Sequence, residues 1–149
     1  MTEYCMKPIG TIHTPFKEND GTPIQSARST AYGEIEVFPE YEAGLESIDG
    51  FSHLILIYVF HQALNSTELM AKPFLDDTPH GVFSTRFYRR PNPIGLSVVH
   101  LLERYGLRLK VQNVDMLDET PLLDIKPYVP EFDVHTVEKL GWYTNRAHP

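Results

Sequence analysis

A single glycine between two alternating segments constrains the fold of this chain more than any other sequence feature. From residue 107 to residue 112, a leucine or valine alternates with an arginine, lysine or glutamine. Such period-two alternation is typical of a β-strand with one buried and one wet face. Residues 96–105 run up to Gly106 from the other side, so residues 96–115 predict an antiparallel hairpin that turns at Gly106.

Four more segments have the pattern of strands. Residues 8–13 predict an opening strand, residues 32–38 a half-buried one, and residues 122–125 a last short one. Residues 51–61 contain the longest apolar run, which predicts a strand buried on both faces. About six strands joined by turns favour an all-β chain, a small closed or partly open β-barrel or a sandwich, over a parallel α/β sheet.

The remaining segments are expected to be short or irregular. Residues 17–29 are polar and predict a long loop. Residues 39–47 predict a short helix, and residues 134–140 a terminal helical turn or two. Residues 63–76 are expected to be looser and partly helical, and residues 81–85 to form a short strand.

Length and composition indicate one globular domain over residues 1–149, with 42% hydrophobic and 22% charged residues. The apolar run from Leu54 to Phe60 is far too short to span a membrane, and no secretory pattern is visible. Cys5 is the only cysteine, which excludes an internal disulfide and fits a reducing cytoplasm. Because the net charge is -7, any surface that binds RNA has to be local.

Residues 86–97 read Arg-Phe-Tyr-Arg-Arg-Pro-Asn-Pro-Ile-Gly-Leu-Ser. The two prolines fix their own φ and hold the preceding residues extended, so we expect a stiff, non-helical loop. Gly95 permits either a close backbone approach or a positive φ. Three arginines within five residues make this the local basic surface of an acidic chain. We therefore interpret the segment as a loop that contacts a ligand rather than a plain turn.

The seven histidines do not form a recognisable metal motif. His53 and His61 are expected at the two ends of one strand and on the same face, with His80 or His100 as a third ligand. No two histidines have the spacing that zinc sites often show, and a His-Glu-x-x-His motif is absent. We expect no metal site. Of the histidines, we retain only His61 as a candidate functional residue, as a polar group at the end of a strand.

Motifs of two large enzyme classes are also missing. The sequence has no Gly-x-Ser-x-Gly elbow for a nucleophilic serine, and Cys5 lies in a terminal stretch. Neither Gly-x-Gly-x-x-Gly nor a Walker sequence is present, so nothing indicates Rossmann-type cofactor binding.

Carboxylates gather at Asp115, Asp118, Glu119 and Asp124. Residues 118–121 have the composition of a turn. Asp124 lies inside an apolar run, and because burying an unpaired charge is costly, we expect its carboxylate to be either paired or functional. Lys126 is the available partner. The sequence favours neither a functional role of Asp124 nor a structural pairing with Lys126.

Several strings together resemble one family. They are Asp-Gly-Phe-Ser-His-Leu at 49–54, Tyr-Val-Phe-His at 58–61, Thr-Arg at 85–86, Arg-Pro-Asn-Pro-Ile-Gly-Leu-Ser at 90–97, Leu-Asp at 117–118, Thr-Pro at 120–121 and Leu-Asp-Ile-Lys-Pro-Tyr at 123–128. Ile-Gly at 9–10, Thr-Pro-Phe at 14–16 and Gly21, Pro23 and Gln25 extend the pattern. They look like the TsaA/YaeB-like (TrmO) family, over nearly the whole chain.

The resemblance implies a small β-barrel, a homodimer, and S-adenosylmethionine bound near the dimer interface. Characterised members methylate N6 of threonylcarbamoyl-adenosine at position 37 of transfer RNA. The expected partners are therefore a tRNA substrate and S-adenosylmethionine, with no membrane.

The resemblance also suggests roles for individual residues. The residues expected to bind the cofactor are Arg86, Asn92, Pro93, Ile94, Gly95, Leu96 and Ser97. Those expected to bind the substrate are Gln25, Arg89, Arg90, Lys126 and Tyr128. The catalytic candidates are Asp124 as the base that takes the acceptor proton, Asp118 as a second choice, and His61. Either carboxylate is alternatively a ligand of ribose hydroxyls.

Two positions depart from the family pattern. Phe87-Tyr88 replaces the Ser-Pro that commonly follows Thr-Arg, and Glu119 replaces the glycine of Leu-Asp-Gly-Thr-Pro. We expect both changes to bear on substrate identity more than on cofactor binding. From the resemblance we also expect that the C-terminal domain of longer bacterial relatives is absent here. The alternatives are a methyltransferase with another small or RNA substrate, a non-catalytic S-adenosylmethionine-binding module, and a metal hydrolase built on the histidines.

Overall fold

The computed structural model describes residues 1–18, 29–73 and 76–144. The chain divides into two compact units, Met1–His61 with Ile94–Tyr128 and Gln62–Pro93 with Val129–Pro149. The single domain expected over residues 1–149 stays a prediction. No helix within the described ranges is long and apolar enough to cross a membrane.

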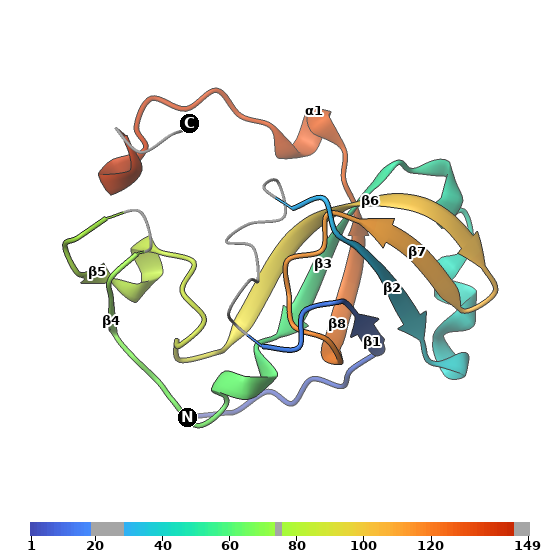
Figure 1. Cartoon of the computed structure of the whole chain (residues 1–149), viewed down its shortest axis with the longest axis horizontal. Helices are drawn as coiled ribbons and strands as arrows, with labels where there is room; N and C mark the ends of the chain where they lie inside the picture. Colours follow the sequence, from blue (N-terminus) through green and yellow to red (C-terminus); the bar gives the residue numbers. More distant parts are fainter. Residues whose placement is uncertain (19–28, 74–75, 145–149) are drawn as a thin grey trace. The chain divides into compact units, whose positions relative to one another are not determined.

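The first unit is a closed antiparallel β-barrel (Figure 1). Its strands are β1 (Gly10–His13), β2 (Tyr32–Val37), β3 (His53–Val59), β6 (Ile94–Tyr105), β7 (Arg108–Gln112) and β8 (Thr120–Pro127). They follow the order β1-β2-β7-β6-β3-β8 around the barrel. The all-β prediction and its barrel are therefore confirmed in the described part of the chain.

Alternation along the strands fills the barrel interior with apolar side chains. Ile12, Ile35, Leu56, Leu109 and Leu122 have no exposed surface. Truncation of such a residue to alanine removes contacts and leaves a cavity, at a cost of about 2–5 kcal/mol. The polar residues between them face outward, as the sequence predicted for residues 107–112.

Strand β3 departs from its prediction. It spans only His53–Val59, with Leu54, Leu56 and Tyr58 buried and the residues between them partly exposed. The expected burial on both faces is wrong, because a barrel wall has one inner face and its outer face remains accessible. His61 lies beyond the strand, in the short 3₁₀ helix η4 (His61–Ala63).

The predicted hairpin of β6 and β7 is confirmed. Tyr105 pairs with Arg108, and Gly106 between them has a φ of +65°. Strand β6 begins at Ile94 rather than at residue 96. Residues 94–97 of the Arg-Pro-Asn-Pro-Ile-Gly-Leu-Ser string therefore belong to a strand, and the predicted loop ends at Pro93.

The predicted helix at residues 39–47 is present as the 3₁₀ helix η2 (Pro39–Leu45), which is followed by the 3₁₀ turn η3 (Ile48–Gly50). Leu45 is buried and Tyr41 packs against the same core. The shared apolar face of these two residues fixes η2 against the barrel.

The second unit contains a two-stranded sheet of β4 (Met70–Ala71) and β5 (His80–Gly81), followed by the 3₁₀ turn η5 (Val82–Ser84). The strand predicted at residues 81–85 is wrong, since the Thr85 amide donates to the Val82 carbonyl at 3.0 Å and closes a turn. The partly helical character expected for residues 63–76 is limited in the described residues to Ala63 of η4, and β4 takes the place of a helix.

The C-terminal helix lies earlier than predicted. It is a single turn, α1 (Pro130–Asp133), and a 3₁₀ turn, η6 (Gly141–Tyr143), follows it. The predicted helix at residues 134–140 is wrong. Val134 is already extended, with φ and ψ of -103° and 126°. The β-branched valines and threonine that follow have low helix propensity.

Candidate functional site

The Arg-Pro-Asn-Pro-Ile-Gly-Leu-Ser string crosses the boundary between the two units. Arg86, Asn92 and Pro93 belong to the second unit, whereas residues 94–97 form the start of β6 in the barrel. Arg86 and Asn92 are exposed, and Pro93 is partly exposed. The cofactor-binding candidates therefore divide into a polar loop group and a strand group.

The three arginines of the loop have different surroundings. The Arg90 guanidinium folds back and donates to the carbonyl oxygens of Thr85 and Phe87, each at 3.0 Å. Arg89 is exposed and lies over the Tyr88 ring, 5.4 Å from its centroid. Arg90 therefore shapes the loop itself, whereas Arg86 and Arg89 are exposed.

Gly95 is glycine because a tyrosine ring covers it. A Cβ atom there would lie 2.4 Å from the Tyr58 ring and 2.8 Å from the Phe60 ring. Gly95 pairs directly with Tyr58 across β3 and β6, and the Tyr58 and Phe60 rings meet edge to face at 5.6 Å. The close approach anticipated from the sequence is thus made to an internal aromatic ring.

Ser97 is also engaged inside the barrel. Its hydroxyl donates to Asp115 Oδ1 at 2.5 Å and lies 2.8 Å from the Tyr58 hydroxyl. Only 2% of Ser97 is exposed. Its side chain therefore supports the wall of the barrel and is not presented to the outside.

The other two strand residues face outward. Ile94 and Leu96 are 45% and 50% exposed. They pair with Val59 and Ile57 of β3. Strand β7 pairs with β6 only from His100 onward, so within the described residues no strand covers the second edge of residues 94–99. The string therefore exposes the apolar side chains of Ile94 and Leu96.

Asp124 lies on the same outer face. It pairs with Ile57 of β3, and Ile57 pairs in turn with Leu96 of β6. Asp124 and Leu96 are therefore two strand spacings apart, about 10 Å. The fold thus brings the first catalytic candidate and the exposed part of the string to one face.

Lys126 is the partner of Asp124, as anticipated. Its Nζ lies 3.0 Å from Asp124 Oδ2, and the two side chains are 58% and 47% exposed. Asp124 is not immersed in apolar side chains, because the β3–β8 register shifts at Leu123 and Asp124 therefore lies opposite the outward Ile57, while Leu122 faces the core. An exposed pair of this kind contributes about 0–1 kcal/mol, so a ligand can displace Lys126 at low cost.

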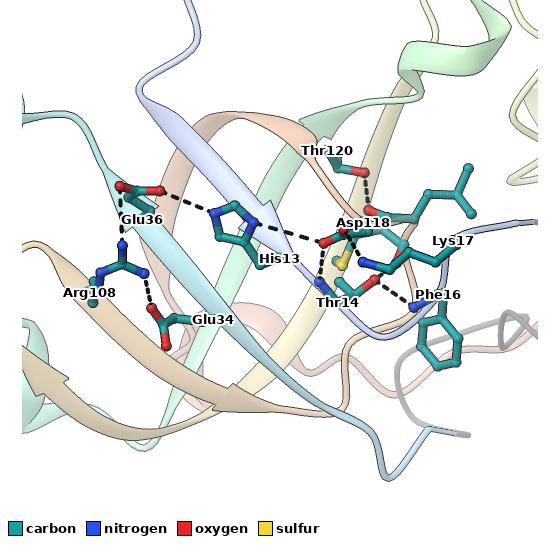
Figure 2. A network of polar contacts seen from close by, with 11 residues as sticks. His13, Thr14, Phe16, Lys17, Glu34, Glu36, Arg108, Asp118 and Thr120 are labelled. Carbon is teal, nitrogen blue, oxygen red and sulfur yellow. Dashed lines mark hydrogen bonds and ion pairs between the residues drawn. The ribbon is translucent and has the colours of Figure 1, made fainter.

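Asp118 is held in a different network (Figure 2). Its carboxylate accepts the Thr14 amide at 2.8 Å and a short hydrogen bond from Lys17. Burial alone would raise the pKa of the Asp118 carboxyl, but the Lys17 ammonium and the Thr14 amide together lower it below its ordinary value. An anchored carboxylate with a lowered pKa is a weak base, so this geometry favours a structural role that ties β1 to the turn before β8.

The remaining candidates are spread over the barrel. The Tyr128 amide donates to the His53 carbonyl at 3.1 Å, and the two rings meet edge to face at 6.4 Å. His53 also stacks on His100, with centroids 4.9 Å apart. His61 is partly buried in η4, so the expectation that His53 and His61 end one strand is wrong. Gln25 lies outside the described residues.

Sequence reasoning did not select Tyr58 or assign a role to Asp115. The alternation of β3 marks Tyr58 as an inward residue, but its contacts with Gly95 and Ser97 depend on the β3–β6 register. Among the described residues, no three histidine, cysteine or acidic side chains form a group that could hold a metal ion.

Comparison with known proteins identifies the family. Residues 11–134 match the model of the tRNA-methyltransferase O N-terminal domain, TrmO_N. The chain belongs to the TrmO family. Glu119, where the family pattern has glycine, has a φ of +64°, a conformation that glycine adopts without strain. The family's glycine thus meets a backbone requirement at this turn.

Relatives cover the chain to different extents. A protein of Pyrococcus abyssi named "Probable S-adenosyl-L-methionine-binding protein" is 54% identical over 145 residues, 97% of this chain and 78% of the relative. The "tRNA (adenine(37)-N6)-methyltransferase" of Escherichia coli K12 is 36% identical over 140 residues, 87% of this chain and 60% of the relative.

Solved structures of TrmO have the same architecture. A crystal structure of TrmO from Pseudomonas aeruginosa superposes with a TM-score of 0.79 at 37% identity, covering 94% of this chain and 62% of that one. Another TrmO crystal structure has a TM-score of 0.79 at 38% identity, covering 94% of this chain and 64% of that one. The chain spans roughly three fifths of these longer TrmO proteins.

Proposed function

We propose that this protein transfers the methyl group of S-adenosylmethionine to N6 of adenosine 37 in transfer RNA, with a threonylcarbamoyl-adenosine as the acceptor. The observation that carries the proposal is the TrmO family match over residues 11–134. The Escherichia coli relative is named for methylation of adenine 37 in tRNA, which supports this reaction class. A cytoplasmic location is part of the proposal because the substrate is tRNA.

The outer face of β6 and β8 fits the cofactor chemically. An adenine ring needs an apolar surface, which the half-exposed Leu96 side chain offers. Asp124 offers an acceptor for ribose hydroxyls or for a proton.

The chemical step depends more on alignment of the acceptor nitrogen with the methyl carbon than on a strong acid or base. S-adenosylmethionine supplies a methyl carbon on a sulfonium, and the carbon–sulfur bond breaks as the N6–carbon bond forms. The protein's task is to hold the N6 nitrogen in line with that bond and to exclude water. Asp124 takes the proton that N6 loses, after Lys126 has moved away from Oδ2.

A homodimer formed through the outer face of β3 and β6 is also part of the proposal. Three outward ladder pairs on this face are entirely apolar: Val59 with Ile94, Ile57 with Leu96, and Ile55 with Val98. Apolar side chains that project from a barrel wall lower their free energy when a second surface covers them. Because Leu96 belongs to this face, the proposed cofactor site would border the interface.

A non-catalytic S-adenosylmethionine-binding module is the second candidate. The name of the Pyrococcus abyssi relative, which specifies binding without a reaction, favours it. Calorimetry with S-adenosylmethionine, followed by radiolabelled methyl transfer to bulk tRNA, separates the two. Binding together with incorporation supports the enzyme, and binding without incorporation supports the module.

A further inference from the structure

A hollow with a volume of about 550 Å³ lies on the outside of the barrel, over β1, β2 and β7. It is formed within the first unit, away from the β3–β6 ladder pairs described above. Its lining includes two cations, Lys17 and Lys110, and two tyrosines, Tyr32 and Tyr105; Lys17 is already paired with Asp118.

Two carboxylates of this face, Glu34 and Glu36, already have protein partners (Figure 2). Glu36 lies 3.1 Å from His13 Nε2 and 3.5 Å from Arg108 Nη2. Glu34 accepts a short hydrogen bond from Arg108. The Arg108 guanidinium lowers the pKa of the Glu34 carboxyl against the opposing effect of burial, so this carboxylate stays ionised and paired at neutral pH.

Besides these ion-paired groups, the hollow is lined by one further cation and two aromatic rings. Lys110 is exposed and has no hydrogen bond or ion pair among the described residues. Tyr32 and Tyr105 are 58% and 46% exposed. The Tyr105 hydroxyl donates to Glu34 at 3.0 Å, which holds the ring at the rim of the hollow.

The strand register places these three residues on three adjacent strands, Tyr32 on β2, Lys110 on β7 and Tyr105 on β6. Tyr105 pairs with Arg108 at one end of β7, and Tyr32 pairs with Gln112 at the other. Lys110 lies midway between them on the same outward face. Tyr105 and Tyr32 are therefore offset by four residues along β7, about 13 Å, and by two strand spacings across it, about 10 Å. The resulting separation of about 16 Å is one that two or three nucleotides of single-stranded RNA span.

We propose that this hollow binds a single-stranded segment of RNA, with bases stacked on Tyr32 and Tyr105 and a phosphate at Lys110. Aromatic platforms combined with a cation are how proteins hold unpaired nucleotides without reading their sequence. The inference rests on the proposed function, because tRNA is the RNA that this protein would meet. It adds a second contact surface, separate from the face that holds Leu96 and Asp124.

Fluorescence anisotropy with a labelled RNA hairpin that has an unpaired loop tests the surface. We expect Tyr32→Ala and Tyr105→Ala each to weaken binding about tenfold, because each removes a stacking platform. Tyr32→Phe and Tyr105→Phe keep the rings and should bind within about twofold of the wild type. Lys110→Gln should reduce the slope of log K against log salt by about 0.7, whereas the exposed Lys7→Gln should not.

The outcomes separate this inference from the proposed function. Wild-type hairpin affinity in both alanine variants and in Lys110→Gln, with unchanged melting temperatures, overturns the RNA surface even if tRNA is methylated. Absence of hairpin binding by the wild type overturns it as well. Losses confined to the alanine and glutamine variants support it, even where the wild type shows no methyl transfer and the proposed function fails.

Discussion

Ser97 Oγ lies 2.5 Å from Asp115 Oδ1 and 2.8 Å from the hydroxyl of Tyr58, so one serine joins two other polar groups inside the barrel wall. A serine has one proton to donate, and here it goes to the carboxylate. The Tyr58 hydroxyl must then donate to Ser97. This chain of hydrogen bonds accounts for the serine that ends the Arg-Pro-Asn-Pro-Ile-Gly-Leu-Ser string.

Ser97→Ala should destabilise the protein by about 1–3 kcal/mol, because it removes the hydrogen bonds that the Ser97 hydroxyl makes with Tyr58 and Asp115 inside the barrel wall. Tyr58→Phe is the matched variant: it keeps the ring and removes one hydroxyl, and it should cost about 1 kcal/mol. Urea unfolding measures both values. Equal stability of Ser97→Ala and the wild type would contradict the hydrogen-bond chain.

Gly95→Ala should cost about 1–3 kcal/mol, since its Cβ would overlap the Tyr58 ring and force a shift in a packed wall. Gly44→Ala is the control, because nothing lies within 4 Å of the corresponding Cβ. Thermal unfolding of the two variants makes the comparison. Equal melting temperatures of Gly95→Ala and the Gly44→Ala control would show that the Tyr58 ring does not clash with a Cβ atom at position 95.

Glu119→Gly should stabilise the protein by about 1 kcal/mol, because Glu119 has a φ of +64° and side chains with a Cβ are strained there. Glu119→Ala keeps the Cβ and should show no such gain. Cofactor affinity should be the same in both variants. A gain in Glu119→Ala as large as in Glu119→Gly would mean that the charge, and not the backbone, is responsible.

The free energy of unfolding should decrease in acid, because the Asp118 carboxylate loses its charge there. Its pKa in the folded protein is lowered, so its contribution is present above the unfolded value of roughly 4 and is lost as pH falls through the folded value. Asp118→Asn should lose about 1 kcal/mol at pH 7. The difference from the wild type should shrink below about pH 4. Urea unfolding across this range tests it, with the exposed Asp49→Asn as control; a gap that widens in acid contradicts the assignment.

Asp124→Asn should lower turnover on the order of 100-fold if Asp124 takes the acceptor proton, while cofactor affinity stays within a few-fold. Lys126→Gln is the matched variant, because it removes the partner and leaves the carboxylate. It should retain most of the turnover. A parallel loss of cofactor affinity in Asp124→Asn would instead assign Asp124 to ribose binding, and full turnover would remove it from the chemistry.

Local patterning predicted the barrel well because each strand shows its inner face in the sequence. The alternation at residues 107–112 and the turn at Gly106 required no knowledge of other segments. The helix expected at residues 134–140 failed because a few apolar residues spaced along a β-branched stretch do not outweigh its low helix propensity.

The site was harder to predict because its contacts depend on which strands become neighbours. The string marked Gly95 and Ser97 as special, but their partner Tyr58 is fixed by the β3–β6 register. Asp124 was expected among apolar side chains, since its sequence neighbours are apolar. The register shift at Leu123 places it opposite the outward Ile57 and leaves it paired with Lys126 on the outer face.

Methyl transfer to a defined tRNA tests the central claim most directly. Purified protein is incubated with radiolabelled S-adenosylmethionine and threonylcarbamoylated tRNA, and with the same tRNA carrying guanosine at position 37. Nucleosides are then separated by mass spectrometry. The proposed function predicts label in an N6-methylated nucleoside from the first tRNA alone. Equal label in both tRNAs, or cofactor binding with no label in either, would contradict it.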